Sequence, residues 1–588
     1  MNEALEKTGP WRDWGGGITY VGTPPSREFP LWTRGNAGEV FPQVVYPLSY
    51  TSSFENAERA FRRAAVGSGA VTESDLGAEP FVGVGCFAGY TYLNMSFGRL
   101  IAMRAPGGDA AAMDRVAYGI SDAPEHVPSR RDRSFMATLR ILRGALRTLR
   151  MDAVPELDAD KERVERWRAG LPDPATATDE ELLNVAQPTI DLAAELFDRH
   201  IWVSNLVGTP FITVQKICED KLGDAAVAMI LLGGVGEVES AAPATAIWDL
   251  GRLVADDPAL TAQFDQGVPG LADRLANDPS AAVFNAEFAA FLIEFGCRGP
   301  NEWEPACEVW GTNPGLPLAL IDRMRSADPE SDPRAQAERL AAERETAVAE
   351  ALTGVKGLNR WMLSKALTSA AVLSQGRERA KTTVVRAIHE SRIRTRELGR
   401  RAAAAGGEDA RPDDIWYVTI DELGDYVADP AAYAEPIAER RAARDYLAER
   451  EPPFLVQGSP PPVDEWPLRG RTEKAAEAGE VLTGIAGSAG ITRGTARVVH
   501  DPAHPGALGP GDVLIAPYTD PSWTPLFVPA QAVVVDVGAQ LSHAVIVSRE
   551  LGIPCVVSVT DATLTIPDGA IIEVNGTTGE VTVVELPA

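Results

Sequence analysis

The amino-acid sequence predicts a multidomain α+β protein, with a large, mainly helical part followed by a small β/α domain. Three features support this prediction. Apolar residues recur three and four positions apart over long segments before residue 405, which is typical of amphipathic helices. Short runs rich in β-branched residues follow one another between residues 496 and 585, as in a sheet. A proline-rich stretch lies between the two regions and is poorly suited to a helix interior.

Four segments of the first part show the helical pattern most clearly: residues 189–209, 280–296, 333–352 and 360–405. Residues 1–100 are richer in aromatic residues, glycine and proline, and they predict mixed structure. We therefore expect a mainly helical domain over residues 1–450. A stiff, extended, proline-rich linker is expected over residues 451–477, and a compact domain over residues 478–588.

The C-terminal domain is predicted to contain six short strands, at residues 496–501, 512–517, 532–537, 554–559, 570–575 and 580–585. The sequence Asn-Gly-Thr-Thr-Gly at residues 575–579 predicts a hairpin loop between the last two strands. One helix, at residues 544–551, is expected to interrupt the strands. His543 lies at the strand-to-helix turn that precedes this helix.

The bulk composition limits the possible partners of the chain. The 588 residues are 45% apolar and 23% charged, which is typical of a globular protein with a sizeable core. Asp and Glu outnumber Lys and Arg by 83 to 55, so the net charge is −28. Because this charge repels nucleic acid and anionic membranes, we expect neither as a partner.

Several features predict a soluble, cytoplasmic protein. The five cysteines form no C-x-x-C pair, and their odd number favours a reducing compartment over a disulfide framework. The N-terminal residues contain no basic stretch followed by an apolar core, so we expect no signal peptide. No uncharged apolar run approaches the roughly 20 residues that a membrane span requires.

His543 is one of only six histidines, and its position suggests a chemical role. A helix N-terminus offers unpaired N–H groups and a partial positive charge, which suit an anion. Ser542 is a good N-cap, and Gly538 would allow a sharp turn after the strand. His543 could therefore present a ring nitrogen, as a covalent nucleophile, where backbone donors hold a phosphoryl group. From the local pattern alone, a capping or core histidine is the commoner case.

A metal site is not expected at His543. No second histidine and no cysteine lie at the spacing that zinc ligands require. We predict no metal ligands in this chain.

The sequence GAQLSHAVIVSRELGIPCVV, which begins at Gly538, resembles the phosphohistidine signature of the swivelling domain in phosphoenolpyruvate-utilising enzymes. Ala539 replaces the second glycine of that pattern. The resemblance implies that His543 carries a phosphoryl group between two active sites. The matching positions are Gly538, Leu541, Ser542, His543, Arg549, Glu550, Gly552, Ile553 and Pro554. Of these, Gly538, Leu541 and Ser542 would form the phosphohistidine loop.

Further segments narrow the resemblance to one branch of the family. Leu541 replaces the threonine common in the dikinases, and TDPSWTPLF at residues 519–527 is similar to rifampicin phosphotransferase and phenylphosphate synthase. Four earlier segments resemble, in the same order, the substrate-binding part of those enzymes: residues 31–50, 90–107, 291–310 and 413–423. The resemblance implies that residues 1–450 form a substrate-binding domain.

The sequence shows no ATP-grasp domain and no phosphoenolpyruvate-binding barrel. The glycine-rich residues 231–240 lack the G-x-x-x-x-G-K-[ST] pattern and a basic partner for phosphates, so we expect an ordinary loop there. In phenylphosphate synthase the ATP-binding part is a separate subunit. The resemblance therefore implies that a separate ATP-grasp subunit binds ATP and Mg²⁺, and that this chain binds neither tightly.

Two residue pairs are candidates for the transfer chemistry. Arg377 and Lys381 are four apart on a predicted helix, so they share one face. The resemblance implies that they face the phosphohistidine, where two cations would stabilise a transferring phosphoryl group. A solvated basic face is the alternative. Arg298 and Glu302 predict either a buried ion pair or a part of the substrate site.

Together these features predict the phosphohistidine and substrate-binding subunit of a split, ATP-dependent phosphotransferase. The phosphoryl group would pass from ATP through His543 to a hydroxyl of a small aromatic acceptor, such as a phenol or alkylphenol. One alternative is a component that phosphorylates a rifamycin-like antibiotic. Another is a phosphocarrier with no acceptor site of its own.

Overall fold

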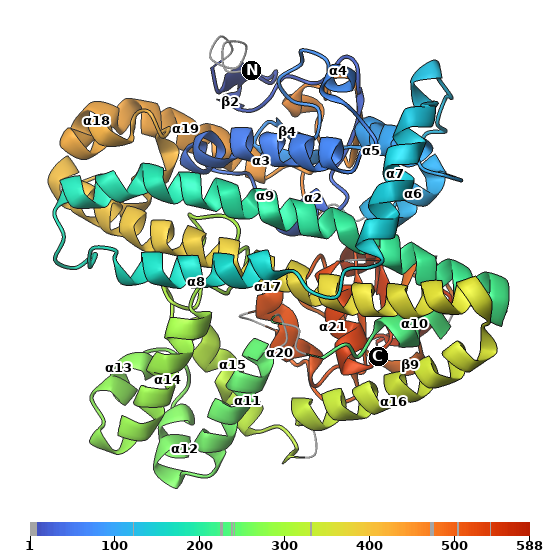
Figure 1. Cartoon of the computed structure of the whole chain (residues 1–588). Helices are drawn as coiled ribbons and strands as arrows, with labels where there is room; N and C mark the ends of the chain where they lie inside the picture. Colours follow the sequence, from blue (N-terminus) through green and yellow to red (C-terminus); the bar gives the residue numbers. More distant parts are fainter. Residues whose placement is uncertain are drawn as a thin grey trace. The chain divides into compact units, whose positions relative to one another are not determined.

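The computed structural model describes residues 9–120, 123–223, 227–236, 239, 242–329, 332–470, 475–502, 505–540 and 542–587. It confirms the predicted fold class, a multidomain α+β protein with a large helical region and a C-terminal β/α region (Figure 1). The chain forms two compact units. Unit 1 comprises Met1–Val207, Trp303–Ala306 and Ala380–Arg471. Unit 2 comprises Gly208–Glu302, Cys307–Arg379 and Thr472–Ala588.

Unit 1 is mainly helical, and local capping explains where several of its helices begin. The side chains of Asn94, Asp109 and Ser134 accept hydrogen bonds from first-turn N–H groups of α5, α6 and α7. The longest helices, α9 (Asp179–Ile217) and α17 (Gly357–Gly406), have residues in both units. The others are α2 (Ala37–Val40), α3 (Pro47–Gly67), α4 (Glu73–Leu76), α5 (Met95–Met103), α6 (Ala110–Tyr118), α7 (Phe135–Thr148), α8 (Pro155–Ala169), α18 (Leu423–Ala428) and α19 (Ala434–Ala448).

The mixed structure predicted for residues 1–100 is present. Strands β1 (Trp11–Asp13) and β2 (Thr19–Val21) form a hairpin. A second, four-stranded sheet has the order β4-β5-β3-β6. Its strands are β3 (Leu31–Thr33), β4 (Val84–Phe87), β5 (Tyr90–Asn94) and β6 (Leu455–Gln457).

Strand β6 comes from the segment predicted to be a linker. It pairs with β3, and Trp466 donates a hydrogen bond of 3.0 Å to the carbonyl of Pro461. This part of residues 451–477 is therefore packed within unit 1 rather than extended in solvent. The domain boundaries at residues 450 and 478 stay predictions.

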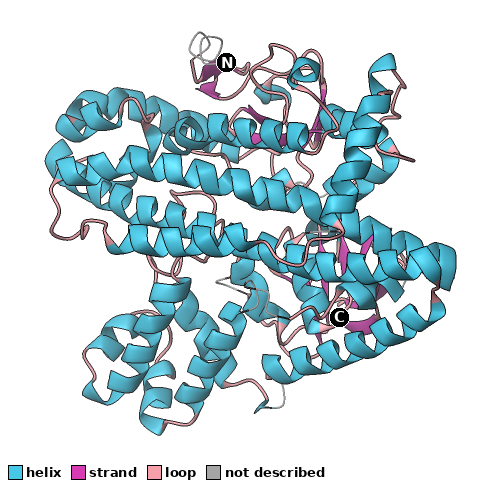
Figure 2. Ribbon diagram, viewed as in Figure 1, coloured by secondary structure: helices cyan, strands magenta, loops and turns pink. Residues whose placement is uncertain are grey.

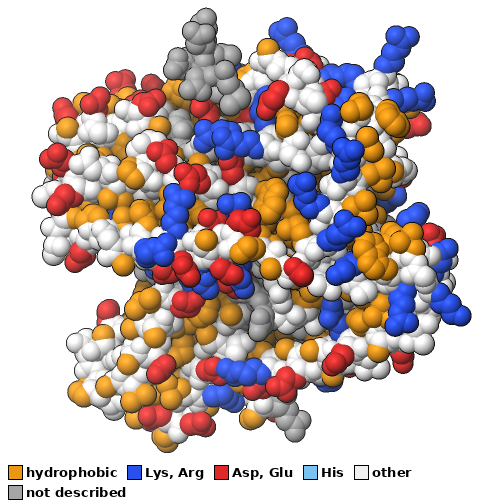
Figure 3. Space-filling view, in the orientation of Figure 1, with side chains coloured by type: hydrophobic (Ala, Val, Ile, Leu, Met, Phe, Trp, Pro, Cys, Tyr) orange, Lys and Arg blue, Asp and Glu red, His pale blue; other side chains and the backbone are white. Residues whose placement is uncertain are grey.

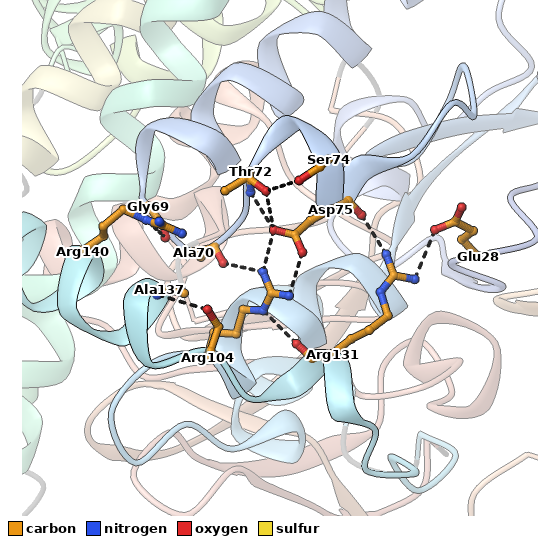
Figure 4. Close-up of polar contacts among 11 residues, drawn as sticks. Glu28, Gly69, Ala70, Thr72, Ser74, Asp75, Arg104, Arg131, Ala137 and Arg140 are labelled. Atoms are coloured by element: carbon orange, nitrogen blue, oxygen red, sulfur yellow. Dashed lines mark hydrogen bonds and ion pairs between the residues drawn. The ribbon is translucent and has the colours of Figure 1, made fainter.

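A buried arginine, Arg104, connects α4 and α5 of unit 1 to the segment before α7 (Figure 4). The Arg104 guanidinium forms a bidentate pair with Asp75 at 2.8 and 2.9 Å, and it also donates to the carbonyls of Ala70 and Arg131. Arg131 in turn donates to the Asp75 carbonyl at 2.7 Å. The hydrogen bond from Arg104 holds the pKa of the Asp75 carboxyl well below its usual range. This network links α4, α5 and the segment before α7.

Unit 2 contains a group of short helices and the large sheet. Figure 2 shows helices packed around the magenta strands of this region. The helices are α10 (Val227–Leu232), α11 (Ala242–Ala255), α12 (Pro258–Phe264), α13 (Leu271–Ala276), α14 (Ala282–Phe295), α15 (Gly315–Arg325) and α16 (Pro333–Gly354), followed by the first part of α17.

The sheet of unit 2 has eight strands in the order β7-β14-β13-β9-β10-β11-β12-β8. Strands β9 to β12 are parallel neighbours, and the remaining pairs are antiparallel. All six predicted strands are present, as β9 (Ile491–Val498), β10 (Asp512–Ala516), β11 (Ala532–Val535), β12 (Cys555–Val557), β13 (Ile571–Asn575) and β14 (Glu580–Glu585). The predicted hairpin joins β13 and β14.

The structure adds elements that the sequence did not predict. Strands β7 (Val481–Thr483) and β8 (Ile485–Ser488) lie at the two edges of the sheet. Besides α21 (His543–Leu551), two four-residue helices occur, α20 (Thr524–Phe527) and α22 (Ala562–Thr565). The expectation of a single helix was therefore wrong, because one turn is too short to show an apolar period.

One hydrophobic core joins the sheet of unit 2 to its helices. Phe291 and Trp310 of the helical group are stacked with ring centroids 5.5 Å apart. They belong to the same buried cluster as Trp523 and Phe527, which lie beside β10 and β11 in the C-terminal domain. The C-terminal domain is thus packed against helices α11–α15 by apolar side chains.

Acidic and basic side chains both occur on the face shown in Figure 3. This face is therefore not uniformly acidic, although the net charge of the chain is −28. Within the described ranges, no helix is both long enough and apolar enough to cross a membrane.

Candidate functional site

His543 lies at the carboxyl edge of the parallel part of the sheet. Strand β11 leads into the loop before α21, and α21 returns the chain to β12, which is parallel to β11. Strand β10 is the other parallel neighbour of β11. Since ligands bind at the carboxyl ends of parallel strands in α/β sheets, the loops after β10 and β11 define the site.

The imidazole of His543 lies between two threonine hydroxyls from the loop after β10. Thr519 Oγ1 is 3.1 Å from Nδ1, and Thr524 Oγ1 is 3.2 Å from Nε2. Phe527 packs edge-on against the ring, with centroids 6.0 Å apart. The ring itself is half-buried. Each ring nitrogen therefore has a hydroxyl within hydrogen-bonding distance, and the ring orientation is fixed.

Ser542 occupies the predicted N-cap position of α21 with an extended backbone. Its hydroxyl makes no capping hydrogen bond, is buried, and has no hydrogen-bond partner among the described residues. A buried hydroxyl without a partner is unfavourable by about 1–3 kcal/mol. Such an atom beside a helix N-terminus is suited to a ligand that supplies an acceptor, for example a phosphoryl oxygen.

The other two residues of the predicted phosphohistidine loop are Gly538 and Leu541. Gly538 does not adopt a left-handed backbone, so no positive φ angle requires the glycine at this position. A Cβ atom at Gly538 would lie 2.8 Å from the Cβ of Val557, so the glycine is required by close packing against β12. Leu541 lies outside the described residues.

Two residues of the signature, Arg549 and Gly552, lie at the end of α21. Arg549 Nε donates to the carbonyl of Gly487 at 2.9 Å, which links α21 to β8. Burial lowers the pKa of Arg549 to about 10. Gly552 ends the helix in the left-handed conformation, which agrees with the helix end predicted at residue 551.

A buried carboxylate positions the loop that carries the two threonines. Asp520 Oδ2 accepts a hydrogen bond of 2.9 Å from the backbone N–H of Asn301. Asp520 Oδ1 accepts from the backbone N–H of Ser522 at 2.9 Å and from its hydroxyl. Burial raises the pKa of Asp520 to about 6, and the charge of Glu302 contributes to the same shift.

Arg298 and Glu302 form the buried ion pair that was one of the two sequence-based interpretations. Arg298 Nη1 lies 2.9 Å from Glu302 Oε1, and the side chains are 1% and 0% exposed. The pair lies beside Asn301, so it supports the contact with Asp520. The structure thus brings these residues toward the loop that holds His543, in a supporting position. A direct role in substrate binding stays a prediction.

Arg377 and Lys381 both lie on α17, and both are half-buried. The boundary between the two units falls between them, at Arg379 and Ala380. Their predicted role toward the phosphohistidine stays a prediction.

The described part of the glycine-rich segment contacts α21. The backbone N–H groups of Val235 and Gly236 donate to the carboxylate of Glu550. Gln375 Nε2 donates to the carbonyls of the same two residues, at 3.2 and 3.0 Å. Burial raises the pKa of Glu550. These N–H groups therefore bind a protein carboxylate in this structure. Residues 237, 238, 240 and 241 lie outside the described residues.

Sequence analysis missed Thr519, Asp520 and Thr524 as site residues. They lie in TDPSWTPLF, which was used only to compare branches of the family. A usable signal was present, because this segment follows a predicted strand just as His543 follows the next one. The described part of the chain contains no group of three or more His, Cys, Asp or Glu residues that could hold a metal ion.

A histidine at the start of a helix, on a loop after a parallel strand of a small β/α domain, is the arrangement expected of a mobile phosphohistidine domain. Comparison with known families agrees. The model for the mobile domain of PEP-utilising enzymes matches residues 508–579, which include His543, Thr519 and Thr524. The model for the fourth domain of rifampicin phosphotransferase matches residues 200–378. These two matches, one in each of two separate regions of the chain, support a relationship to the PEP-utilising enzymes.

Curated relatives support this family. The chain is 36% identical to an uncharacterized protein of Mycobacterium tuberculosis over 53% of its own length and 33% of the relative. It is 32% identical to the prodigiosin synthesizing transferase PigC of Serratia marcescens, over 57% and 38%. It is 29% identical to rifampicin phosphotransferase of Streptomyces sviceus, over 57% and 38%. The chain thus spans between a third and two fifths of the length of these relatives.

Proposed function

We propose that this chain supplies the phosphohistidine and the acceptor-binding part of an ATP-dependent phosphotransferase. The observation that carries the proposal is the position of His543, the first residue of α21, beside the buried Ser542 hydroxyl, which has no hydrogen-bond partner within the described part of the chain. A phosphoryl group on the ring would give this hydroxyl and the N-terminal N–H groups of α21 an anion to bind. The relatives named phosphotransferases support the same chemistry.

The phosphoryl transfer proceeds in two steps. A ring nitrogen of His543 forms a bond to a phosphorus atom of ATP, and the bond from that phosphorus to a bridging oxygen breaks, so that the rest of the nucleotide leaves with the electron pair. In the second step an acceptor oxygen bonds to phosphorus, and the electron pair of the broken N–P bond returns to the ring. The proton of the acceptor hydroxyl passes to water. Histidine is suited to this role because it is a nucleophile that is neutral in a good fraction of molecules near neutral pH.

ATP and Mg²⁺ are proposed to bind to a separate ATP-grasp subunit, as the resemblance to phenylphosphate synthase implies. Magnesium would there neutralise charge on the transferred phosphoryl group. In this chain, His543 receives the group and the residues around it hold it.

The favoured acceptor is a small aromatic alcohol, a phenol or alkylphenol. A second candidate is a rifamycin-like antibiotic, because residues 200–378 match the fourth domain of rifampicin phosphotransferase. The two candidates differ greatly in size and chemistry, so they are distinguished by offering each of them to the phosphorylated protein.

A test that needs no partner uses potassium phosphoramidate, which phosphorylates histidine chemically. Protein loaded in this way is mixed with phenol, 4-methylphenol or rifamycin SV, and products are followed by ³¹P NMR. We expect aryl phosphate from the phenols with wild-type protein and none with His543→Ala. Formation of only a rifamycin phosphate would replace the first acceptor class by the second. Hydrolysis alone, with every acceptor, would reduce the chain to a phosphocarrier.

A further inference from the structure

Helix α7 is attached to unit 1 along one of its faces. Ala137, in the first turn, is completely buried. The hydroxyl of Thr138 donates to the carbonyl of Arg104 at 3.0 Å, and Arg140 Nε donates to the carbonyl of Gly69 at 3.0 Å. Because these contacts hold the helix in place, its opposite face has a defined direction.

The opposite face of α7 exposes large apolar side chains. Phe135, Leu139, Leu142 and Leu146 follow one another at spacings of four, three and four, so they form a single line along the helix. We call these four residues the α7 stripe. Phe135 is 82% exposed, Leu142 is 46% exposed, and Leu146 is also exposed. Met136, beside the stripe, is exposed as well.

Helix α8, in the same unit, shows the ordinary arrangement of a surface helix. Its apolar residues Leu157 and Val164 are buried, and charged residues of both signs, such as Glu162 and Arg166, occupy its exposed positions. An exposed apolar line at coiled-coil spacing is instead typical of a surface that another helix covers. The α7 stripe is about 17 Å long, which corresponds to about three turns of a partner helix.

The surface beside the α7 stripe is strongly basic. Residues 129–150 contain seven arginines and one acidic residue, although the net charge of the whole chain is −28. Helix α7 itself contains no Asp or Glu. Arg143 and Arg147 are exposed, and neither forms an ion pair within the part of the chain that the structure describes. Figure 3 shows hydrophobic and basic side chains next to each other over α7.

We propose that the α7 stripe is a docking surface for an amphipathic helix with acidic flanks, and that the ATP-binding subunit carries this helix. The identity of the partner rests on the proposed function, in which a separate subunit loads His543. Apolar side chains of the partner helix pack on the stripe, and Asp or Glu residues beside them pair with Arg143 and Arg147. The apolar contact supplies most of the affinity, and the flanking charges select the partner.

Two other occupants fit the charges of this surface less well. A second copy of the chain would bring the arginines of two α7 helices together, with no acidic residue on either helix to oppose them. An anionic membrane would attract the arginines, but the net charge of −28 repels the lipid surface from the rest of the chain. The narrow stripe is also the seam of a helix pair rather than a broad apolar face.

The first test measures binding to two designed helical peptides, which both have leucine at every a and d position of the heptad. One peptide has Glu at the flanking e and g positions, and the other has Lys there. Fluorescence anisotropy measures the affinity of each for the full chain. We expect the wild type to bind the acidic peptide and not the basic one. Leu142→Gln should weaken binding of the acidic peptide by about tenfold, the scale of one partly buried leucine.

Leu468→Gln is the matched control, because Leu468 also lies in unit 1 and is 47% exposed. It should leave the affinity unchanged. Arg143→Glu combined with Arg147→Glu should abolish binding of the acidic peptide and create binding of the basic one. Arg166→Glu, at an exposed position of α8, should do neither. Equal binding of both peptides to the wild type, or unweakened binding to Leu142→Gln, would overturn the proposal.

The same proteins test the other two occupants. Sedimentation velocity measures self-association, and flotation with vesicles of phosphatidylcholine and phosphatidylserine measures membrane binding. We expect neither self-association through α7 nor flotation. Self-association that Leu142→Gln abolishes would assign the α7 stripe to a second copy of the chain, and flotation that it abolishes would assign the stripe to a membrane. Either result would overturn the helical partner.

A final test separates the docking surface from the proposed function. An extract of the cells that carry the gene supplies the loading activity, and ATP labelled with ³²P at its β and γ positions reports phosphorylation of His543. The acidic peptide should inhibit this labelling, and the basic peptide should not. Leu142→Gln should be labelled about tenfold more slowly, in proportion to its weaker binding, whereas its loading from phosphoramidate should be unchanged.

The outcomes of this test are distinct. Labelling that the acidic peptide does not inhibit would contradict the ATP-binding subunit as the occupant of the α7 stripe. If ATP labels no variant while the peptide results hold, the proposed function fails and the docking surface for an acidic helix survives.

Discussion

The carboxylate of Asp520 binds the backbone N–H of Asn301 at 2.9 Å, across 219 residues of sequence. This bond ties the loop that holds the His543 ring to the turn that carries the Arg298–Glu302 pair. Burial at this junction removes the hydration of the charged carboxylate and raises the pKa of Asp520, and the hydrogen bond from Asn301 opposes part of this shift.

Asp520 should make stability depend on pH with a defined sign. Burial raises the pKa of the folded protein's Asp520 to about 6, above the ordinary value of 3.8. Between about pH 4 and 6 the folded state therefore binds more protons than the unfolded state, so the free energy of unfolding falls as pH rises. The full difference is roughly 3 kcal/mol. Urea unfolding of wild-type protein and Asp520→Asn across pH 4–7 measures this contribution.

The free energy of unfolding should fall less steeply with pH for Asp520→Asn than for the wild type. Loss of a hydrogen bond in the variant would shift its whole curve by a constant amount without changing this slope. The comparison is necessary because burial also raises the pKa of Asp536, to about 7, which gives a similar slope in both proteins. Parallel pH curves for the two proteins would show that Asp520 does not titrate in this range.

Breaking the Arg298–Glu302 pair should be costly for the fold. Arg298→Met leaves a carboxylate buried at 0% exposure, and the expected loss of unfolding free energy is about 3–5 kcal/mol. The double change Arg298→Met with Glu302→Leu should recover much of this loss, because neither member of the pair then carries a charge. Denaturant unfolding measures both.

An exposed pair in the same unit provides the control. Arg493 lies 2.9 Å from Glu585, with side-chain exposures of 49% and 67%. Arg493→Met should change stability by less than about 1 kcal/mol. A similarly small effect of Arg298→Met would refute the supporting role of the pair and return it to the candidates for substrate binding.

The centre of the site could be predicted because its parts are adjacent in sequence. Ser542, His543 and the helix end at Gly552 are local features, and Arg298 and Glu302 lie in one short segment of sequence. Thr519 and Thr524 depend on the parallel pairing of β10 with β11, which no local pattern specifies. The same holds for the bond from Asn301 to Asp520. Strands β7 and β8, with three and four residues, are too short to show a period.

Glu550 should hold the glycine-rich segment against α21. Its carboxylate accepts from the N–H groups of Val235 and Gly236. Glu550→Ala should speed hydrogen–deuterium exchange at these two amides by about tenfold, the scale of a hydrogen bond to a charged group. Glu550→Gln, which keeps one acceptor, should have a smaller effect. Glu573→Ala, at an exposed position of β13, is the control. Equal exchange in the alanine variant and the wild type would rule out this attachment.

The last prediction concerns Arg377 and Lys381, the basic pair on α17. If they stabilise the transferred phosphoryl group, they act after His543 has been loaded. Arg377→Ala and Lys381→Ala should then accept phosphoryl from phosphoramidate as the wild type does. Each should slow single-turnover transfer to phenol by about 10²-fold, the scale for removing one preorganised charged group from a transition state.

Arg400→Ala is the matched control on the same helix, because Arg400 is 63% exposed and pairs with Glu397 one turn away. It should change neither loading nor transfer, and it should leave the stability nearly unchanged. Arg377→Lys separates charge from shape, since a lysine keeps the charge but loses the planar fork of donors. Partial rescue by lysine would indicate that charge dominates. If Arg377→Ala and Lys381→Ala transfer as fast as Arg400→Ala, the pair belongs to a solvated face, and other cations must stabilise the transferred group.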